Sequence, residues 1–587
     1  MYNRRLMAGG AAFGLLVLVV VAFVLVAPRG VAGRLNALAQ QQLGRSLAVN
    51  GGTHLDFSPL SVRLDDATLS GAAPEDDSLA TVKSAVIPVT LGQLFGAAPE
   101  IASITLTEPE FALLINDRGE ANWDFPGFTP GGPLRIQLEQ ARFRYFDTRN
   151  SQSMALTHVD GTLDMRADGG ASFAGTAVIN GRLVRIDADL KSLARINADG
   201  SPLEIALAAD DGNASFSGRL STAEVLSLAG PVSLSSQTPG PGLRLIGLPL
   251  PAGITATGAI AIDGALDSAG RAYAIRNATL SMGNFRAAGE LGADLRNATP
   301  KLQARLVADR LWLDPFMPAS GAKNGDWGRV PLPFALLKAF DIEATIDARS
   351  MSFGGFTAGG SELRIALTDG KLDVTSVSDL DTDGTLNVTV KADANAAPPS
   401  VAVNMIANDI AAQPLLGALT GATQLTGTGG FTANFTAGGT TQEELVGMLK
   451  GTASIDLVNG SIAGADLAGL VLAAKQKVLE GWQAAPGDTP FTSLRGETTI
   501  QDGIANFRNA TIEGPVSFTL EGLIDVLRQG IAVSTTATTN GQPLLPVAVI
   551  ARGPWGAPKI FADVPSFIAN PDGSTAPLQD PASPQGN

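Results

Sequence analysis

The chain has 587 residues, a formal net charge of −15 and no cysteine. Its length allows a large buried core, its acidic balance disfavours nucleic acid as a partner, and the lack of cysteine excludes disulfides, lipoprotein acylation, thiolate metal sites and cysteine nucleophiles. Aromatic residues make up only 5%, whereas there are 67 glycines and 35 prolines. The core must therefore be aliphatic, as in long β-structures with many turns.

The first element in chain order is an uncharged apolar segment from Leu6 to Ala27. At about 1.5 Å per residue, this segment is long enough to cross roughly 30 Å of hydrocarbon as one helix. It exceeds the apolar run of a cleaved signal peptide, and Pro28 would resist cleavage after Ala27. We therefore predict a retained single-pass anchor in residues 1–28, with a short cytoplasmic tail and the bulk of the chain on the far side.

Helical periodicity is rare in the rest of the chain. The stretches that show it are Val31–Ser46, Leu91–Phe95, Gln442–Leu449 and Ala465–Trp482. The segment Pro331–Phe340 is predicted to be a linker into a new unit or an apolar loop that contacts lipid. Everything else favours strands.

Alternation with a period of two dominates the sequence. From Leu363 the chain reads LRIALTDGKLDVTSV, in which apolar residues alternate on either side of Asp369-Gly370. This pattern predicts a hairpin with one apolar face. The same kind of turn is predicted at six more dipeptides, which are Asp160-Gly161, Asn180-Gly181, Asp263-Gly264, Asp383-Gly384, Asn459-Gly460 and Asp502-Gly503.

Internal repetition accompanies the alternation. The sequence Arg-Asn-Ala-Thr occurs at 276–279, 296–299 and 508–511, and the segment from Arg63 to Leu69 resembles it. We interpret these copies as recurrent strand-turn-strand units, although similar strands can also arise by chance in a chain rich in Thr, Ala and Gly.

The block from Ile104 to Phe125, ITLTEPEFALLINDRGEANWDF, resembles the N-terminal signature of the AsmA family. In that signature, a strand ending L-x-x-P-x-apolar leads through a short turn to G-x-x-N-W. The matching positions here are Pro109, Gly119, Asn122 and Trp123. Upstream, the segment from Leu43 to Gly51 is similar to the one that follows the family's membrane-proximal helix.

The C-terminal part resembles the same family. The segment from Leu449 to Leu467 is similar to the family's C-terminal motif, with Gly451, Asn459 and Gly460 at motif positions. The expected later segments, Thr489–Ala505 and Gly553–Lys559, follow in order. The resemblance covers roughly residues 1–150 and 400–565, and the middle of the chain resembles the family only in its general sequence pattern.

The resemblance implies a mainly β fold, an elongated and repetitive antiparallel sheet curled into a groove, with a few short helices and one N-terminal transmembrane helix. It implies a protein anchored in the inner membrane of a Gram-negative cell, with most of the chain in the periplasm and a role in outer-membrane biogenesis. We divide the chain into the anchor (1–28), an AsmA-like N-terminal unit (29–150), repeated β-units (151–440), an AsmA-like C-terminal unit (441–565) and a disordered tail (566–587).

An apolar sheet face must be covered by a second sheet, by helices or by ligand. The predicted helices are too few to cover it, so acyl chains could lie along it if the sheet curls into a groove. The resemblance, whose family members are similar to bridge-like lipid-transfer proteins, implies that these acyl chains belong to phospholipid. The candidate groove-lining residues are Leu363, Ile365, Leu367, Leu386, Val388 and Val390. The alternative is a sealed β-sandwich or β-helix core that holds no lipid.

Enzyme chemistry has little support in the sequence. The two histidines, His54 and His158, are far apart in the chain, and no phosphate-binding loop of the Walker type occurs. A carboxylate pair for glycoside hydrolysis is possible among 56 acidic residues, but the aromatic platforms of sugar sites are scarce. We predict no catalytic residue, no cofactor and no metal. The predicted partners are phospholipid, the inner membrane and proteins of outer-membrane assembly or the envelope. The alternative function is a scaffold or regulator of outer-membrane protein assembly that carries no lipid.

Overall fold

The computed structural model describes residues 45–562 with gaps, and the chain divides into two compact units. The gaps are 72–77, 91–101, 117–121, 123–132, 149–151, 180, 194, 197–198, 222–224, 238–257, 315–326, 381–382, 465, 470, 472–486, 540–541, 544–547 and 555–557. Unit 1 comprises the chain up to Gly283 together with Glu290–Arg296, and unit 2 comprises Asn284–Gly289 and the chain from Asn297 onward. This division falls inside the predicted 151–440 region, and the sequence-based domain boundaries stay predictions.

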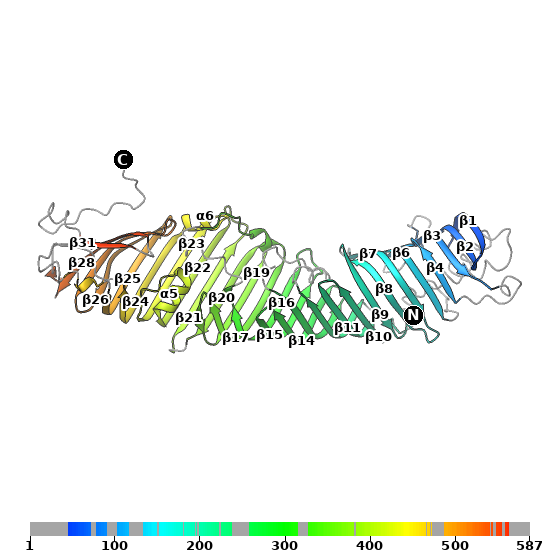
Figure 1. Cartoon of the computed structure of the whole chain (residues 1–587), viewed down its shortest axis with the longest axis horizontal. Coiled ribbons are helices and arrows are strands. Elements are labelled where there is room, and N and C mark those ends of the chain that lie inside the picture. The colour runs from blue at the N-terminus through cyan, green and yellow to red at the C-terminus, as the bar shows by residue number, and fades with distance from the viewer. Residues whose placement is uncertain are drawn as a thin grey trace, which may run out of the picture. The chain divides into compact units, whose positions relative to one another are not determined.

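Unit 1 is a single β-sheet (Figure 1). Its strands are β1 (Leu47–Phe57), β2 (Leu60–Leu69), β3 (Ala80–Pro88), β4 (Ser103–Thr107), β5 (Glu110–Ile115), β6 (Leu134–Asp147), β7 (Gln152–Met165), β8 (Ala171–Ile179), β9 (Arg182–Leu190), β10 (Ser201–Ala209), β11 (Gly212–Ser221), β12 (Ser227–Ser236), β13 (Ile260–Ala269) and β14 (Ala272–Met282). Neighbouring strands pair antiparallel, except that β4 and β5 both lie parallel to β6. The next strand, β15 (Phe285–Asp294), is divided between the two units.

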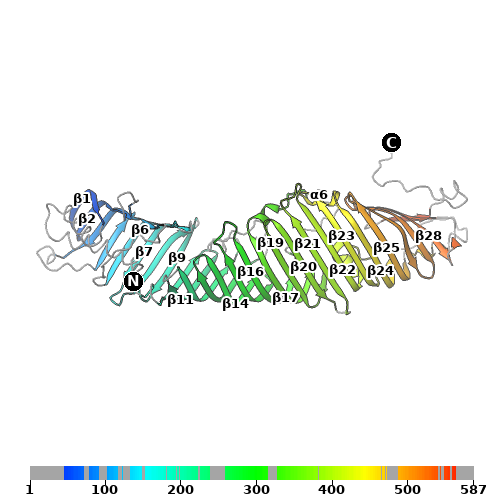
Figure 2. The same ribbon diagram turned by 180° about the vertical axis from the view of Figure 1, so that it is seen from behind.

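Unit 2 is also built on a sheet, with short helices at its rims (Figures 1 and 2). Its strands are β16 (Lys301–Trp312), β17 (Asp341–Phe353), β18 (Phe356–Ala358), β19 (Ser361–Thr368), β20 (Lys371–Asp379), β21 (Thr385–Asp393), β22 (Ser400–Ala411), β23 (Thr428–Gly438), β24 (Lys450–Ala463), β25 (Asp488–Gln501), β26 (Ile504–Glu513), β27 (Ser517–Asp525), β28 (Gly530–Thr539), β29 (Gln542–Pro543), β30 (Val549–Pro554) and β31 (Lys559–Ala562). β16 and β17 are parallel, and the later strands of the unit pair antiparallel. The mainly β prediction is therefore confirmed.

In the parts of unit 2 that the structure describes, the named helices are few and short. They are the 3₁₀ helix η4 (Phe334–Lys338), α5 (Ala412–Thr420) and α6 (Gln442–Gly447). The sequence predicted α6, and residues 467–469 and 471 are helical inside the predicted Ala465–Trp482 helix. It missed α5, which contains the helix-disfavouring residues Pro414 and Gly417. The helix tolerates Pro414 because this residue lies in the first helical turn, where its missing N–H has no intrahelical partner. The predicted helices Val31–Ser46 and Leu91–Phe95 lie outside the described residues, apart from Arg45 and Ser46, which are not helical.

The predicted hairpin at Asp369-Gly370 is confirmed. β19 ends at Thr368, β20 starts at Lys371, and both turn residues have positive φ, as the tight turns that suit a hairpin require. Asp383-Gly384 and Asp502-Gly503 also lie between strands, as does Gly181, whereas Asn180 lies outside the described residues.

Three other turn predictions were wrong. Asp160-Gly161, Asp263-Gly264 and Asn459-Gly460 lie inside β7, β13 and β24, where the strand pairing shifts register or breaks locally. These strands are long, and an extra residue in one strand of a pair is accommodated as a β-bulge. The same residue types serve both features, because a bulge, like a tight turn, often places a residue at positive φ.

The recurrent Arg-Asn-Ala-Thr motif forms a bulge in two of its copies. Asn277 and Asn509 both have positive φ inside a strand, as does Asp66 in the related segment. Ala67 and Ala278, which follow Asp66 and Asn277, are 4% and 0% exposed. The copy at 296–299 lies between β15 and β16 and forms no strand. The strand-turn-strand prediction is confirmed after the first and last copies, where β14 and β26 are followed, after a short turn, by β15 and β27, and the motif itself forms a bulge within the first strand.

Candidate functional site

The six candidate groove residues all lie on one face of unit 2. Across the sheet, cross-strand partners form rows, and Val390 belongs to a row that crosses β16 to β24. This Val390 row consists of Ala304, Ala344, Ile365, Val374, Val390, Val403, Phe435 and Gly451. The neighbouring Val388 row consists of Leu306, Ile346, Leu363, Ser376, Val388, Met405, Ala433 and Ala453. On the other side lies the Leu372 row, which consists of Leu302, Ile342, Leu367, Leu372, Ala392, Val401 and Ala437.

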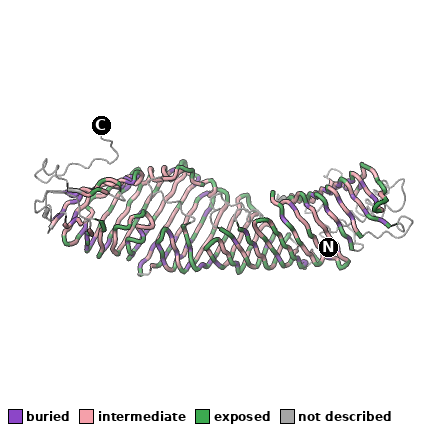
Figure 3. Tube along the Cα trace, viewed as in Figure 1, coloured by how far each residue is buried: buried purple, intermediate pink, exposed green. Residues whose placement is uncertain are grey.

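The opposite face of the same strands is polar. In each strand, one residue separates the member of the Val388 row from the member of the Val390 row, and its side chain points to the other face. These residues form a row of their own: Arg305, Thr345, Arg364, Thr375, Thr389, Asn404, Asn434 and Thr452. Successive side chains of a strand point to opposite faces, so strict alternation in each strand separates the two rows. Figure 3 shows the resulting alternation of exposure along the strands.

The apolar face is not equally covered over its width. Every residue of the Val390 row is half-buried, and so is every residue of the Leu372 row except Leu367. Leu367 and Leu386 are each 1% exposed and Leu363 is 7% exposed. Of the six candidates, Leu363, Leu367 and Leu386 are therefore core residues, while Ile365, Val388 and Val390 keep accessible surface.

One rim of the apolar face is closed by α5 and the β17–β18 hairpin. Leu415 of α5 is 1% exposed, Phe353 and Phe356 are 8% and 4% exposed, and the rings of these two phenylalanines lie 5.2 Å apart. Ala412 and Leu416 of α5 join a buried cluster with residues of β24 to β28, among them Phe491 and Phe518. Figure 1 shows α5 lying over the strands. This part of unit 2 is a sealed core.

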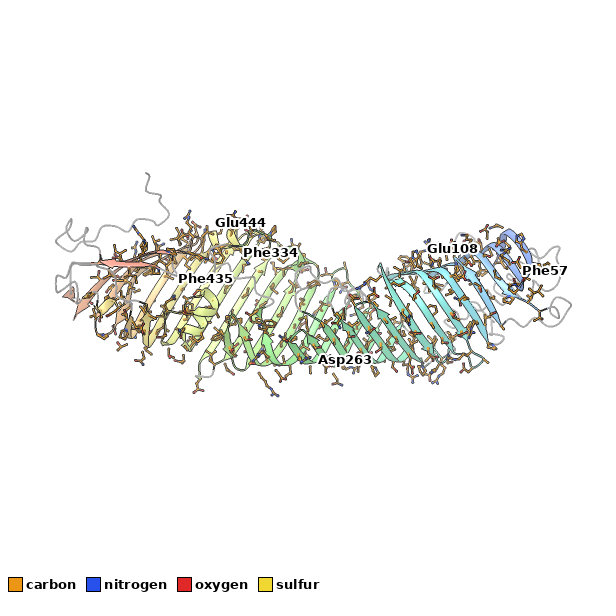
Figure 4. All side chains as sticks on the ribbon, in the orientation of Figure 1. Phe57, Glu108, Asp263, Phe334, Phe435 and Glu444 are labelled. Atoms are coloured by element: carbon orange, nitrogen blue, oxygen red, sulfur yellow. The ribbon has the colours of Figure 1, made fainter. Side chains whose placement is uncertain are left out.

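The opposite rim carries a different cover, the segment Trp327–Lys338, which we call the strap. Its Leu332 N–H donates to the Thr440 carbonyl at 2.7 Å, and its Trp327 indole N–H donates to the Leu527 carbonyl at 2.9 Å. Arg329 pairs with Glu443 at 2.6 Å, with both side chains exposed. Figure 4 places Phe334 of the strap and Glu444 of α6 at this rim.

Unit 1 has the same two-faced organisation. A row of cross-strand partners consists of Leu163, Phe173, Ala188, Ile205, Phe216 and Val232, and the next consists of Ile186, Leu207, Ala214, Leu234, Ile262 and Leu280. On the opposite face, a row of polar and small residues consists of Thr162, Ala174, Asp187, Ala206, Ser215, Ser233, Asp263 and Thr279. Asp263, labelled in Figure 4, belongs to this polar face. Most members of the two apolar rows are half-buried.

The N-terminal strands of unit 1 differ from this open arrangement. Leu64 and Ile87 are fully buried, Leu69 and Ile104 are 1% and 2% exposed, and the apolar interior of β1 to β5 holds a cavity of only about 20 Å³. Phe111 stacks on Phe143 with ring centroids 4.7 Å apart. The described residues at this end of the sheet form a filled apolar core.

The polar face of unit 1 is held by ion pairs. Asp189 lies 2.8 Å from the Lys191 ammonium and 2.6 Å from the Arg166 guanidinium. The hydrogen bond from Lys191, followed by that from Arg166, lowers the pKa of Asp189 below its ordinary value of 3.8, against the effect of desolvation. These charges favour contact of this face with water rather than with lipid.

Two of the N-terminal motif residues have clear structural roles. Asn122 is 6% exposed, its side-chain oxygen accepts from the Leu114 N–H at 2.9 Å, and its amide nitrogen donates to the Ala112 carbonyl at 2.8 Å. The side chain therefore satisfies the backbone of β5. Pro109 is buried at the break between β4 and β5. Gly119 and Trp123 lie outside the described residues.

The C-terminal motif residues shape β24. Gly451 has a φ of +151°, and a Cβ there would lie 1.9 Å from the Asn434 carbonyl oxygen of β23. Asn459 has a φ of +52° at a bulge, and a Cβ on Gly460 would lie 2.3 Å from the Phe491 ring. These residues allow close strand approach, and none of them presents a reactive group.

Within the described parts of the chain, no group of His, Asp and Glu residues is arranged to hold a metal ion. Nor does any helix in those parts have the length and apolar character to cross a membrane. The apolar segment Leu6–Ala27 lies outside the described residues, so its prediction as an anchor stays a prediction.

Comparison with known proteins matches the AsmA family over residues 2–128 and 321–510, more than half of the chain. The protein belongs to the AsmA family. This confirms the resemblance seen in the sequence, and it relates the protein to the bacterial cell envelope and outer-membrane biogenesis. The AsmA family is not known as a family of enzymes. No curated protein and no solved structure is similar enough to this chain to give a match.

Proposed function

We propose that this AsmA-family protein is anchored in the inner membrane, lies mostly in the periplasm, and binds phospholipid along the apolar faces of its two units. The observation that carries the proposal is the Val390 row, in which eight cross-strand neighbours are apolar or glycine and every one is half-buried. An apolar surface of this continuity on a stable protein marks a binding surface. Acyl chains are the ligand whose shape and chemistry it fits.

The dimensions of this surface support an acyl chain as ligand. The Val390 and Leu372 rows are two residues apart along each strand, which is about 7 Å, and they cross from β16 to β23. We call these two rows together the strip. With strands about 4.8 Å apart, the strip is about 29 Å long. This is close to the full hydrocarbon thickness of a bilayer, about 30 Å, and so exceeds the length that one leaflet's chains occupy.

The energetics support transfer rather than permanent binding. Burying one methylene gains about 0.8 kcal/mol, so a C16 chain gains on the order of 10 kcal/mol on leaving water. A bilayer offers the chain a similar gain. Exchange between the strip and a membrane is then close to isoenergetic, as a lipid carrier requires.

The second candidate function is a scaffold for outer-membrane protein assembly that carries no lipid. It is favoured by the two sealed cores, the cluster around Leu64 and Ile87 in unit 1 and the cluster around Phe491 and Phe518 in unit 2. A scaffold needs a rigid sheet and no accessible strip. The scaffold function does not explain why the apolar Val390 row is only half-buried.

Site-specific photocrosslinking in cells distinguishes the two functions. A photoreactive amino acid at Val390 is compared with one at Thr389, its neighbour in β21, which is also half-buried but lies on the polar face. The proposal predicts a phospholipid adduct at Val390 and none at Thr389. Protein adducts at Thr389 without lipid at Val390 would favour the scaffold.

A further inference from the structure

The two rims of the apolar face in unit 2 are built differently. At the α5 rim, buried residues close the face, among them Leu415, Met351 and Phe356 at 1%, 2% and 4% exposure. A Cβ on Gly354 would lie 3.1 Å from the Ala418 side chain, so hairpin and helix are in tight contact. A lipid cannot pass this rim without unfolding part of the core.

The strap rim is held far more lightly. The 3₁₀ helix η4 within the strap has no buried residue, and Leu332, Phe334, Leu336 and Leu337 are only half-buried. The Arg329–Glu443 ion pair is exposed, and exposed ion pairs contribute little to stability. Segments with few buried apolar contacts are among those that open locally.

The strap follows the ends of the strands rather than crossing the middle of the sheet. It contacts the β19–β20 turn, where a Cβ on Gly370 would lie 3.1 Å from Lys338, then the loop before α6 at Thr440, then the β27–β28 turn at Leu527. The Leu372 row is the outermost apolar row at these strand ends, and it is half-buried except at Leu367. The accessible strip therefore borders the loosely held rim.

We infer that phospholipid enters and leaves unit 2 sideways, through a portal between the strap and the strand ends at the Leu372 row. The inference rests on the proposed function and adds a route to it. The strap is the movable side of the portal, and its apolar side chains cover the strip when no lipid is passing. Lipid exchange then requires the hydrogen bonds of Leu332 and Trp327 to open.

The absence of cysteine from the chain allows a clean test. A Cβ on Gly328 would lie 3.9 Å from Cγ of Gln442, so cysteines at the two positions come close to one another, and loss of free thiol on oxidation verifies that their disulfide forms. The full-length Gly328→Cys/Gln442→Cys protein, with a photoreactive residue at Val390, is reconstituted and mixed with vesicles of phosphatidylethanolamine and phosphatidylglycerol that carry a traceable phospholipid. Crosslinking of that lipid is measured in the oxidised and reduced states.

The control pair is Gly417→Cys/Thr423→Cys, which bridges α5 to the loop after it at the opposite rim, where a Cβ on Gly417 lies 3.4 Å from Thr423. We expect oxidation of the strap pair to reduce the lipid adduct to the level seen at Thr389, reduction to restore it, and oxidation of the control pair to change nothing. Equal adducts in the locked and reduced strap variants would overturn the portal while leaving lipid binding intact. No adduct in either state would overturn the proposed function and the portal with it.

Discussion

Leu386 and Val388 lie two residues apart on β21 and point to the same face, yet Leu386 is 1% exposed and Val388 is half-buried. The apolar face of unit 2 thus changes from sealed to accessible over about 7 Å along one strand. Residues that look equivalent in the sequence therefore lie in different environments in the fold.

This difference predicts different outcomes for a buried charge. Leu386→Asp places a carboxylate in a sealed core and should lower the free energy of unfolding by about 3 kcal/mol or more. Val388→Asp leaves the carboxylate partly hydrated and should cost less than half as much. Urea unfolding followed by circular dichroism measures both, with Thr389→Asp on the polar face as the control. Equal costs at Leu386 and Val388 would mean that the whole face is sealed.

The side chain of Asn122 is predicted to be structural. Asn122→Ala leaves the Leu114 N–H and the Ala112 carbonyl without their side-chain partner, which should cost about 2 kcal/mol. Asn213, an exposed residue of β11, is the matched position, and Asn213→Ala should change stability by about 0.5 kcal/mol or less. Thermal unfolding of the two variants tests this. A neutral Asn122→Ala variant would show that the motif acts other than through the backbone of β5.

Close strand approach at Gly451 predicts a steric penalty. In Gly451→Ala, the new Cβ meets the Asn434 carbonyl at 1.9 Å, so β23 and β24 must separate locally, at a cost of about 3 kcal/mol. Gly464 has a φ of +94° but open space around it. Gly464→Ala therefore reports backbone strain alone, about 1 kcal/mol. A similar loss in both variants would remove the steric explanation.

The N-terminus of α6 should loosen in acid. The Thr440 N–H and hydroxyl donate to the Glu444 carboxylate at 2.6 and 2.8 Å, and the Glu444 N–H donates to Thr441 Oγ1 at 3.1 Å. The hydrogen bonds from Thr440, the backbone one first, lower the pKa of Glu444 below its ordinary value of 4.5. A lowered folded-state pKa means that the stabilisation is complete above pH 4.5 and is lost as the pH falls through the folded value.

Hydrogen exchange of the Thr440 amide between pH 7 and pH 3, corrected for intrinsic exchange, measures this loosening. Protection should fall in the wild-type protein at the acid end. In Glu444→Gln, protection should be lower at pH 7 and nearly independent of pH. A wild-type profile that does not change with pH would contradict the capping role of Glu444.

Much of the sheet was predictable because strand alternation is a local property of the sequence. The rows that contain Ile365 and Val390 follow directly from a period of two, and the turn at Asp369-Gly370 follows from residue types that tolerate positive φ. Asp263-Gly264 and Asn459-Gly460 carry the same local signal, but the neighbouring strands continue past them. Only pairing between strands decides whether such a dipeptide makes a turn or a bulge.

The uneven cover of the apolar face was not predictable from the sequence. Leu367 and Val390 have the same alternation but different burial, and α5 and the strap, which lie at the two rims of the face, come from distant parts of the chain. α5 begins with Ala-Gln-Pro and contains Gly417, so its helical propensity is weak and its contacts with β18 and β22 decide its place. The strap reaches Leu527 from Trp327, a contact across 200 residues that no local pattern encodes.

The most direct test of the central claim is mass spectrometry of lipids that co-purify with the protein after its N-terminal segment is released at a protease site introduced between residues 29 and 44. We expect bound phospholipid in the wild-type protein and in Thr389→Asp, and its loss in Val390→Asp at an unchanged circular dichroism spectrum. A wild-type protein free of lipid, or equal lipid in both variants, would contradict the claim that the apolar face of unit 2 binds phospholipid.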